Sequence, residues 1–317
     1  MSVKAAVALA AMLAGGCAAP APTSTSTPAP TPTPTPTSAP APFEAVDAAP
    51  PASDWVAACA DWDDWDKPGP PFRIHGNSFY VGTCGIAAIL VTAPQGHVLI
   101  DTGTEAGAET VLANVERLGF DPRDIAVLLS SHEHFDHVGG AALVQQRTGA
   151  KLYASAPAAA VLASGEAGED DPQAGMHDPM APASVGRIVR PGETVEVGPL
   201  RMTMIATPGH TPGAVSWQWQ SCEGEDCRSI VYADSLSPVS ADDYRFSDHA
   251  AYLAAYRAGL ADLAALDCDI LLTPHPSASQ MRERLVVGDL TDATACRTYA
   301  ASIDARLNER LAAEAAR

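Results

Sequence analysis

The stretch "SHEHFDH", residues 131–137, contains three histidines, a glutamate and an aspartate. Imidazole and carboxylate groups are ligands that zinc accepts in proteins. A hydrophobic core rarely contains such side chains, so three histidines within six positions are hard to explain by packing. The alternative interpretation is a solvated polar loop. We therefore take a metal site as the first hypothesis.

Two further histidines follow apolar segments in the same way as His132. His210 lies in "TPGHTPG" after "RMTMIA", and His275 lies in "LTPHP" after "CDILL". Each apolar segment is typical of a strand, and loops at one edge of a sheet can bring distant residues together. Five histidines and Asp136 would supply three ligands to each of two zinc ions, with an open position for water.

The order of predicted elements indicates a layered α/β fold. Residues 78–103 predict two strands joined at "PQG", and 105–120 predict a helix that stops at Gly119. A buried strand over 124–131 leads into the histidine loop, and 137–149 predict one helix. After an irregular stretch at 164–184 the pattern repeats, with helices at 248–267 and 293–315. Interleaved strands and helices in two comparable halves place helices outside the sheets.

Length and charge restrict the partners. The 317 residues suffice for one large domain, and 47% of them are hydrophobic. The formal net charge is −19, and Lys4, Lys67 and Lys151 are the only lysines. Nucleic acid and anionic membrane surfaces need clustered Lys and Arg, so we exclude them as partners. A small-molecule substrate and a monomeric chain are the expectation.

The N-terminus has the pattern of an export signal. "MSVKAAVALAAMLAGGC" places a lysine before a short apolar run and small residues, and the run is too short to span a bilayer comfortably. Residues 1–17 therefore predict export to the periplasm, with either ordinary cleavage or a lipid anchor on Cys17. Residues 18–51, rich in Ala, Pro, Thr and Ser, predict a disordered linker before a folded domain at 52–317.

Six cysteines remain besides Cys17, and an oxidising compartment favours disulfides between them. They are Cys59, Cys84, Cys222, Cys227, Cys268 and Cys296. Six cysteines allow 15 connectivities, so their spacing predicts three bridges and leaves the pairing open.

The pattern H-x-H-x-D-H, with later histidines in "TPGHTPG" and "TPHP", resembles the metallo-β-lactamase superfamily from Trp55 to the C-terminus. "GHTPGAVSWQW", "YADSLSPVSADDYRFSD" and "CDILLTPHPSAS" are similar to class B β-lactamases of the third subclass, and the cysteine placement is most similar to one of its members. The resemblance implies a four-layer αβ/βα sandwich with the site in a cleft at one edge of the sheets. It also implies the disulfides Cys59–Cys84, Cys222–Cys227 and Cys268–Cys296.

The same resemblance implies two Zn²⁺ per chain. His132, His134 and His210 would hold the first, and Asp136, His137 and His275 the second. A metal-bound hydroxide, oriented by Asp136, would attack the amide of a β-lactam. The implied substrates are β-lactam antibiotics (penicillins, cephalosporins and carbapenems), so the enzyme would confer antibiotic resistance.

Further roles follow from the resemblance. Ser235 and Ser237 would bind substrate, although local turn hydroxyls are the alternative, and Gln173 would line the cleft. Asp101 and Asp234 would support the ligands through hydrogen bonds. Asp234 has a competing role, because glyoxalase II uses an aspartate after the same strand to bridge two metals. The tryptophans are expected mostly in the core or at the rim, with a place beside the cleft as the alternative for Trp62 and Trp65. His75, His97, His177 and His249 lack ligand spacing and are expected at surface or core positions.

Two other functions stay open at this point. One is a hydrolase of the same fold that acts on a thioester or a lactone. The other is a periplasmic zinc-binding protein without catalysis. The chain lacks S-x-x-K and G-x-S-x-G, so chemistry with a serine nucleophile has no motif.

Overall fold

The computed structural model describes residues 49–60 and 63–316. The predicted export signal at 1–17 with Cys17, nearly all of the linker at 18–51, and Trp62 lie outside these residues. Within the described ranges, no helix combines the length and the apolar character that a membrane span requires.

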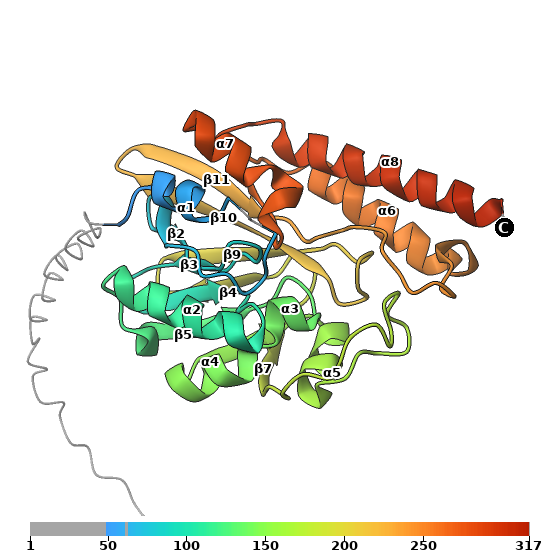
Figure 1. Cartoon of the computed structure of the whole chain (residues 1–317), viewed down its shortest axis with the longest axis horizontal. Helices are drawn as coiled ribbons and strands as arrows, with labels where there is room; N and C mark the ends of the chain where they lie inside the picture. Colours follow the sequence, from blue (N-terminus) through green and yellow to red (C-terminus); the bar gives the residue numbers. More distant parts are fainter. Residues whose placement is uncertain (1–48, 61–62, 317) are drawn as a thin grey trace, which may run out of the picture. The chain divides into compact units, whose positions relative to one another are not determined.

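Two mixed sheets form the centre of the folded unit (Figure 1). Neighbouring strands of the first are antiparallel up to β4 and parallel from there on. Its order is β1 (Phe72–His75), β2 (Ser78–Tyr80), β3 (Ile89–Val91), β4 (His97–Ile100), β5 (Ile125–Leu129), β6 (Lys151–Ala154) and β7 (Val185–Ile188).

The second sheet is antiparallel except for its last pair, β11 with β12. Its order is β12 (Ile270–Leu272), β11 (Asp226–Tyr232), β10 (Val215–Glu223), β9 (Leu200–Ala206) and β8 (Thr194–Val197). The long β10–β11 hairpin keeps its register from the pair Trp217–Tyr232 to Glu223–Asp226.

Helices cover the outer face of each sheet. On the first sheet lie α2 (Glu105–Arg117), α4 (Ala141–Thr148) and α5 (Ala156–Ser164); on the second lie α6 (Ala250–Ala264) and α8 (Ala295–Ala315). Short helices complete the fold: α1 (Ala52–Ala58), α3 (Phe135–Val138), α7 (Met281–Val287), η1 (Pro122–Asp124), η2 (Phe246–Asp248) and η3 (Pro276–Ser279).

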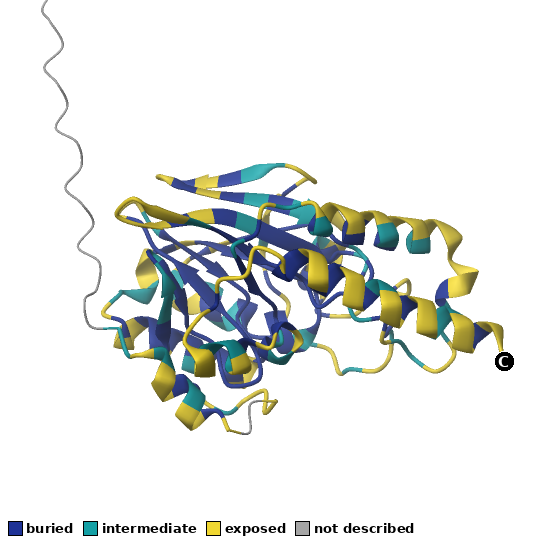
Figure 2. Cartoon of the chain, turned by 90° about the horizontal axis from the view of Figure 1, so that it is seen from above, coloured by how far each residue is buried: buried dark blue, intermediate teal, exposed yellow. Residues whose placement is uncertain are grey.

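The alternation of side chains along the strands explains this layering. Val127 and Leu129 of β5 lie in the core between the two sheets, together with Trp217. Leu128 points the other way and packs under α2 and α4, beside Val115. Successive strand residues face opposite sides of a sheet, so each sheet buries two faces (Figure 2). The predicted four-layer αβ/βα sandwich is confirmed.

Two predicted elements differ from the structure. The predicted hairpin at 78–103 contains three strands, because the chain turns between Val81 and Ala88 before β3 begins. The predicted helix at 137–149 is two helices, α3 and α4, separated at Gly139–Gly140. A Cβ on Gly140 would come within 2.3 Å of the Cβ of Ala108 in α2, so this glycine permits close packing of α2 on the histidine segment.

Three disulfides fasten the periphery. Cys59–Cys84 joins the end of α1 to the loop after β2, and Cys222–Cys227 closes the tip of the β10–β11 hairpin. Cys268–Cys296 joins the segment before β12 to the first turn of α8. These are the pairs that the family resemblance implies.

Candidate metal centre

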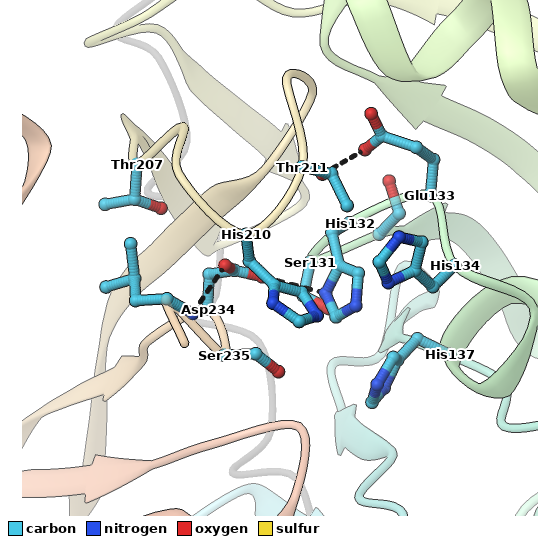
Figure 3. A network of polar contacts seen from close by, with 12 residues as sticks. Ser131, His132, Glu133, His134, His137, Thr207, His210, Thr211, Asp234 and Ser235 are labelled. Carbon is cyan, nitrogen blue, oxygen red and sulfur yellow. Dashed lines mark hydrogen bonds and ion pairs between the residues drawn. The ribbon is translucent and has the colours of Figure 1, made fainter. Parts of the chain in front are cut away.

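The predicted ligands lie on loops that follow β5, β9 and β12, and these loops meet at one edge of the sandwich. Figure 3 shows His132, His134, His137 and His210 gathered there. The loop after β5 passes into α3, whose first turn carries Asp136 and His137. His210 and His275 arrive from the second sheet. The architecture therefore brings residues that are 143 positions apart, from His132 to His275, into one site.

Two groups of donor atoms are close enough to hold metal ions. His132, His134 and His210 offer ring nitrogens within 4.8 Å of one another, and all three side chains are buried. His132, Asp136 and His137 form a second such group. His275 borders it, with its Nε2 3.4 Å from Oδ2 of Asp136.

Protein groups occupy one nitrogen on each histidine of the first group. Asp234 Oδ1 lies 2.8 Å from Nδ1 of His132, and both side chains are fully buried. Asp171 Oδ2 lies 3.0 Å from Nε2 of His134. The carbonyl oxygen of Ser237 lies 3.0 Å from Nδ1 of His210. The Ser131 hydroxyl also lies 3.2 Å from Nδ1 of His132. Such partners fix ring orientation and tautomer and turn the other nitrogen toward the centre.

Asp101 holds the start of the histidine loop in place through hydrogen bonds. Its carboxylate accepts hydrogen bonds from the amide and the hydroxyl of Ser131, both at 2.7 Å, and from the Tyr232 hydroxyl at 2.8 Å. Its backbone has φ of 61°, a left-handed conformation that costs a residue with a Cβ about 1–2 kcal/mol. The three hydrogen bonds offset this cost and hold the residue before His132 in place.

Burial and the neighbouring side chains together set the charge states in the cluster. Burial and the neighbouring imidazoles hold the pKa of His132 well below 6.5 and lower the pKa of His210 to about 3. Burial alone would raise the pKa of Asp136, but the His137 and His275 side chains outweigh it and hold this pKa well below 3.8. Burial alone would lower the pKa of His134, but the Asp171 carboxylate outweighs it and raises this pKa. Neutral imidazole and ionised carboxylate are the forms that bind metals, and His132, His210 and Asp136 favour these forms.

The unpartnered atoms fit zinc. Nε2 of His132 and both ring nitrogens of His137 are buried without a hydrogen-bond partner among the described residues. A buried polar atom without a partner costs about 1–3 kcal/mol. Zinc prefers imidazole nitrogen with carboxylate oxygen, and these residues supply both.

The predicted substrate residues lie beside the histidines. The Ser235 hydroxyl is buried and has no hydrogen-bond partner in the described part of the chain. The Ser237 hydroxyl lies 3.1 Å from Nδ1 of His210, and the Gln173 amide nitrogen lies 3.3 Å from its Nε2. Ser237 and Gln173 therefore contact His210 from opposite ring nitrogens, and Ser235 lies beside it (Figure 3).

Aromatic side chains line the rim of the centre. Trp65, 37% exposed, has its ring centroid 5.7 Å from that of His275 and 5.9 Å from that of Phe135. His177 lies 5.0 Å from Phe135 and 5.6 Å from His134. His177 is half-buried, lies 3.4 Å from the Gln173 side-chain oxygen through its Nε2 and belongs to neither donor group, so it borders the centre from a surface position. His75, His97 and His249 lie away from the centre.

Sequence reasoning missed two carboxylates. Asp171 lies in the irregular stretch at 164–184, which is rich in Pro, Gly and acidic residues, and nothing in its pattern indicates a partner. Glu133 lies inside the histidine motif itself, where its position between two ligands was an available signal. It accepts hydrogen bonds from Thr211 and Gly213. Burial raises its pKa to about 7.

Comparisons with known proteins agree with this geometry. The sequence profile of the Metallo-beta-lactamase superfamily matches residues 81–275. The structure of the MIM-2 metallo-beta-lactamase is 61% identical, with a TM-score of 0.80 over 83% of this chain and 98% of that one. That of MEM-A1, a subclass B3 metallo-beta-lactamase isolated from a soil metagenome library, is 42% identical, with a TM-score of 0.78 over 80% and 99%.

Curated relatives match over a shorter range. A hydroxyacylglutathione hydrolase from Serratia proteamaculans is 34% identical over 130 residues, which are 40% of this chain and 41% of the relative. The chain thus spans about two fifths of the length of the curated relatives that it matches.

Proposed function

The chain belongs to the metallo-β-lactamase superfamily, within subclass B3, and we propose that it hydrolyses the amide of β-lactam antibiotics at a centre of two zinc ions. The observation that carries this proposal is the convergence of two groups of His and Asp donors from loops of both sheets. Penicillins, cephalosporins and carbapenems are the proposed substrates, and antibiotic resistance the consequence.

The proposed ligands divide into two sets. His132, His134 and His210 hold one zinc, and Asp136, His137 and His275 hold the other. Zinc ions bound there supply Lewis-acid activation of water and of the substrate carbonyl. Asp136 is ionised and lies 2.9 Å from His137 Nε2, so its carboxylate can also accept a hydrogen bond from the attacking water and orient it.

The substrate carboxylate needs hydrogen-bond donors, because a buried anion without partners is costly. Lys67 and Lys151, the two lysines of the described residues, lie outside the loop at 234–237. The Ser235 hydroxyl, buried and unpartnered among those residues, is the best available donor. We propose Ser237 and Gln173 as further substrate contacts.

A thioesterase of the glyoxalase II type is the second candidate, and the hydroxyacylglutathione hydrolase relatives favour it. In that candidate Asp234 bridges two metals. The carboxylate of Asp234, however, faces Nδ1 of His132 with Oδ1 and accepts a hydrogen bond from the Leu236 amide with Oδ2. This orientation supports the role of holding His132, and with it the β-lactamase proposal.

We further propose that the protein is exported to the periplasm as a monomer. Three disulfides support an oxidising compartment. The proposed organisation is an export signal at 1–17, a linker at 18–51 and the catalytic domain at 52–317. Cys17 carries a lipid anchor or is lost with ordinary cleavage. Within subclass B3, the cysteine placement resembles that of the Adelaide imipenemase.

An assay of the purified protein tests the proposal. A carbapenem and S-lactoylglutathione are offered separately, each with and without a zinc chelator. We expect carbapenem hydrolysis that the chelator abolishes and zinc restores. Rapid cleavage of S-lactoylglutathione, with the carbapenem left intact by zinc-loaded protein, would favour the thioesterase.

A further inference from the structure

Glu133 joins the two loops that carry the first histidine group. It lies between His132 and His134, is 3% exposed, and turns away from the proposed ligands (Figure 3). Its Oε2 accepts a hydrogen bond from the Thr211 hydroxyl at 2.7 Å, and its Oε1 accepts one from the Gly213 amide at 2.8 Å. Both donors belong to the loop that carries His210, about 80 positions away in sequence.

The contact between Glu133 and Gly213 is tightly packed. A Cβ on Gly213 would lie 2.6 Å from Oε2 of Glu133 and 2.5 Å from the backbone nitrogen of Ala158 in α5. The Ser155 hydroxyl, at the start of α5, donates a hydrogen bond to the Gly213 carbonyl at 2.7 Å. Gly213 is therefore fixed from both sides. Glu133 connects it to the histidine motif through a side chain, two residues before the Val215 amide donates a backbone hydrogen bond to the Ser131 carbonyl at 2.7 Å.

The two proposed zinc sites differ in whether their ligands come from the two loops that Glu133 joins. The first site needs His132 and His134 from one loop and His210 from the other, so its geometry depends on the distance between these loops. The second site takes Asp136 and His137 from α3 and His275 from the loop after β12, to which Glu133 makes no described hydrogen bond.

We propose that Glu133 is a positioning residue that holds the His210 loop against the H-x-H segment and so sets the zinc affinity of the three-histidine site selectively. Neither of its oxygens faces the centre, so it acts through hydrogen bonds and not as a ligand. This inference rests on the proposed function in one respect, namely that the centre binds zinc.

Length-matched variants separate hydrogen bonding from charge. Glu133→Met removes both acceptors at similar length and leaves the Gly213 amide buried without a partner. Glu133→Gln removes the charge but preserves both contacts, because its carbonyl can accept from Gly213 and its amide can donate to the Thr211 hydroxyl. Thr211→Val removes one contact from the other side of the interface.

Each variant is made in two background variants, each of which keeps only one of the two zinc sites. His275→Ala leaves the three-histidine site, and His210→Ala leaves the other. Zinc dissociation constants are measured by competition with a chromophoric chelator. Loss of a group that orients metal ligands costs about 10- to 100-fold in metal affinity. We expect Glu133→Met to show this loss in the His275→Ala background and less than about threefold change in the His210→Ala background.

Glu133→Gln should stay within about threefold of the parent, and Thr211→Val should lie between the two. Glu314→Met is the matched control, because Glu314 is equally buried, accepts two backbone hydrogen bonds and lies at the far end of α8. It should lower Tm without changing zinc affinity.

Equal losses of zinc affinity in both backgrounds, or a loss in Glu133→Gln as large as in Glu133→Met, overturn the proposal. If Glu133→Met does not fold, Thr211→Val in the two backgrounds decides the matter by the same criterion. A wild-type protein that binds no zinc would contradict the proposed function instead, so the two failures are distinct.

Discussion

Each histidine of the first group presents one nitrogen to the centre because a protein group holds the other. The three holding groups differ in kind: the Asp234 carboxylate for His132, the Asp171 carboxylate for His134 and the Ser237 carbonyl for His210. A carboxylate partner makes an imidazole more basic and a better donor to a metal. Residues that never touch the metal thus determine how well the ligands bind it.

Asp171 provides the first test of this view. Its Oδ2 lies 3.0 Å from Nε2 of His134, and its Oδ1 accepts a hydrogen bond from the backbone N–H of Gln173 at 2.7 Å, so one carboxylate positions a ligand and a proposed substrate residue. We expect Asp171→Ala to lower zinc affinity about 10- to 100-fold, measured by chelator competition. The control is Asp170→Ala, which removes the same charge from an exposed neighbour. An equal effect of both variants would show that only charge matters.

Ser235 provides the second test at this scale. Its buried hydroxyl has no described hydrogen-bond partner, so a substrate carboxylate can take that place. We expect Ser235→Ala to reduce kcat/KM for a carbapenem about 10- to 100-fold through KM, because a hydrogen bond to a charged group contributes about 1.5–3 kcal/mol. Zinc content should not change. Against a β-lactam whose carboxylate is esterified, wild type and variant should be alike; a persistent difference would refute the carboxylate contact.

The helical layer on the second sheet also shapes the site. Tyr299 of α8 donates its hydroxyl to the carbonyls of Asp234 and Ser235, at 3.1 and 2.5 Å, and Tyr256 of α6 donates to the carbonyl of Leu236. Leu236 has φ of 50°, a left-handed conformation that branched side chains rarely adopt. Two tyrosines from outside the sheet therefore hold the loop in a strained shape.

Removing one of these hydroxyls should destabilise the loop. We expect Tyr299→Phe to reduce the free energy of unfolding by about 1–3 kcal/mol, because two buried carbonyls lose a donor, and to raise KM through Ser235. Urea unfolding and steady-state kinetics measure the two effects. Tyr252→Phe is the control, since the Tyr252 hydroxyl is buried without a described hydrogen-bond partner and its loss should be neutral or stabilising.

The end of α8 supplies a pH-dependent contribution to stability. Burial alone would raise the pKa of Glu314, but the Arg310 guanidinium and the amides of Ser247 and Phe246 outweigh it and lower this pKa to about 2. A lowered carboxyl pKa means that the folded state favours the ionised form. The contribution of Glu314 to the free energy of unfolding is therefore complete above the pKa of a glutamate in the unfolded chain, about 4.3. This contribution is lost as pH falls towards 2.

Glu314→Gln tests this linkage in metal-free protein. We expect it to be less stable than wild type by about 1–3 kcal/mol at pH 7, since hydrogen bonds to a charged group are lost. The difference should shrink as pH falls from 5 to 2, because the wild-type carboxyl then becomes protonated too. Urea unfolding at each pH gives the values. A difference that is constant over this range would mean that the charge contributes nothing.

The sequence predicted elements best where a periodic pattern was long. The strand at β5, the helix α2 with its stop at Gly119 and the final helix α8 all agree with the expectation. The short strands β7 and β8 were missed. β7 is largely exposed and has no apolar alternation, and β8 alternates over four residues only, which is too short a pattern to indicate a strand. The break between α3 and α4 depends on how closely α2 approaches Gly140, which is a tertiary contact.

At the scale of the whole molecule, the donor set was predictable and its supports were not. His132, His210 and His275 each follow an apolar strand, and strand ends meet at a sheet edge, so local pattern was sufficient to place them together. Asp171 reaches His134 from an irregular segment 37 positions away, and no local pattern encodes that contact. The comparisons identify the family, whereas the individual contacts come from the structure alone.

The final prediction concerns metal removal and global stability. Two sheets meet at a cluster in which Nε2 of His132 and both ring nitrogens of His137 are buried without a hydrogen-bond partner among the described residues, so metal-free protein bears the cost of these groups. A ligand that binds only the folded state stabilises it by RT ln(1 + [L]/Kd), about 2.7 kcal/mol at a hundred times Kd. For a domain of this size, 1 kcal/mol shifts Tm by about 2–4 °C. We therefore expect each bound zinc to raise Tm by about 5–10 °C under these conditions, measured by calorimetry on chelated protein reloaded with zinc. His210→Ala should retain only the part due to the second site. An equal rise in wild type and His210→Ala would show that His210 does not bind the metal, and no rise in wild type would contradict a zinc centre at this edge of the sandwich.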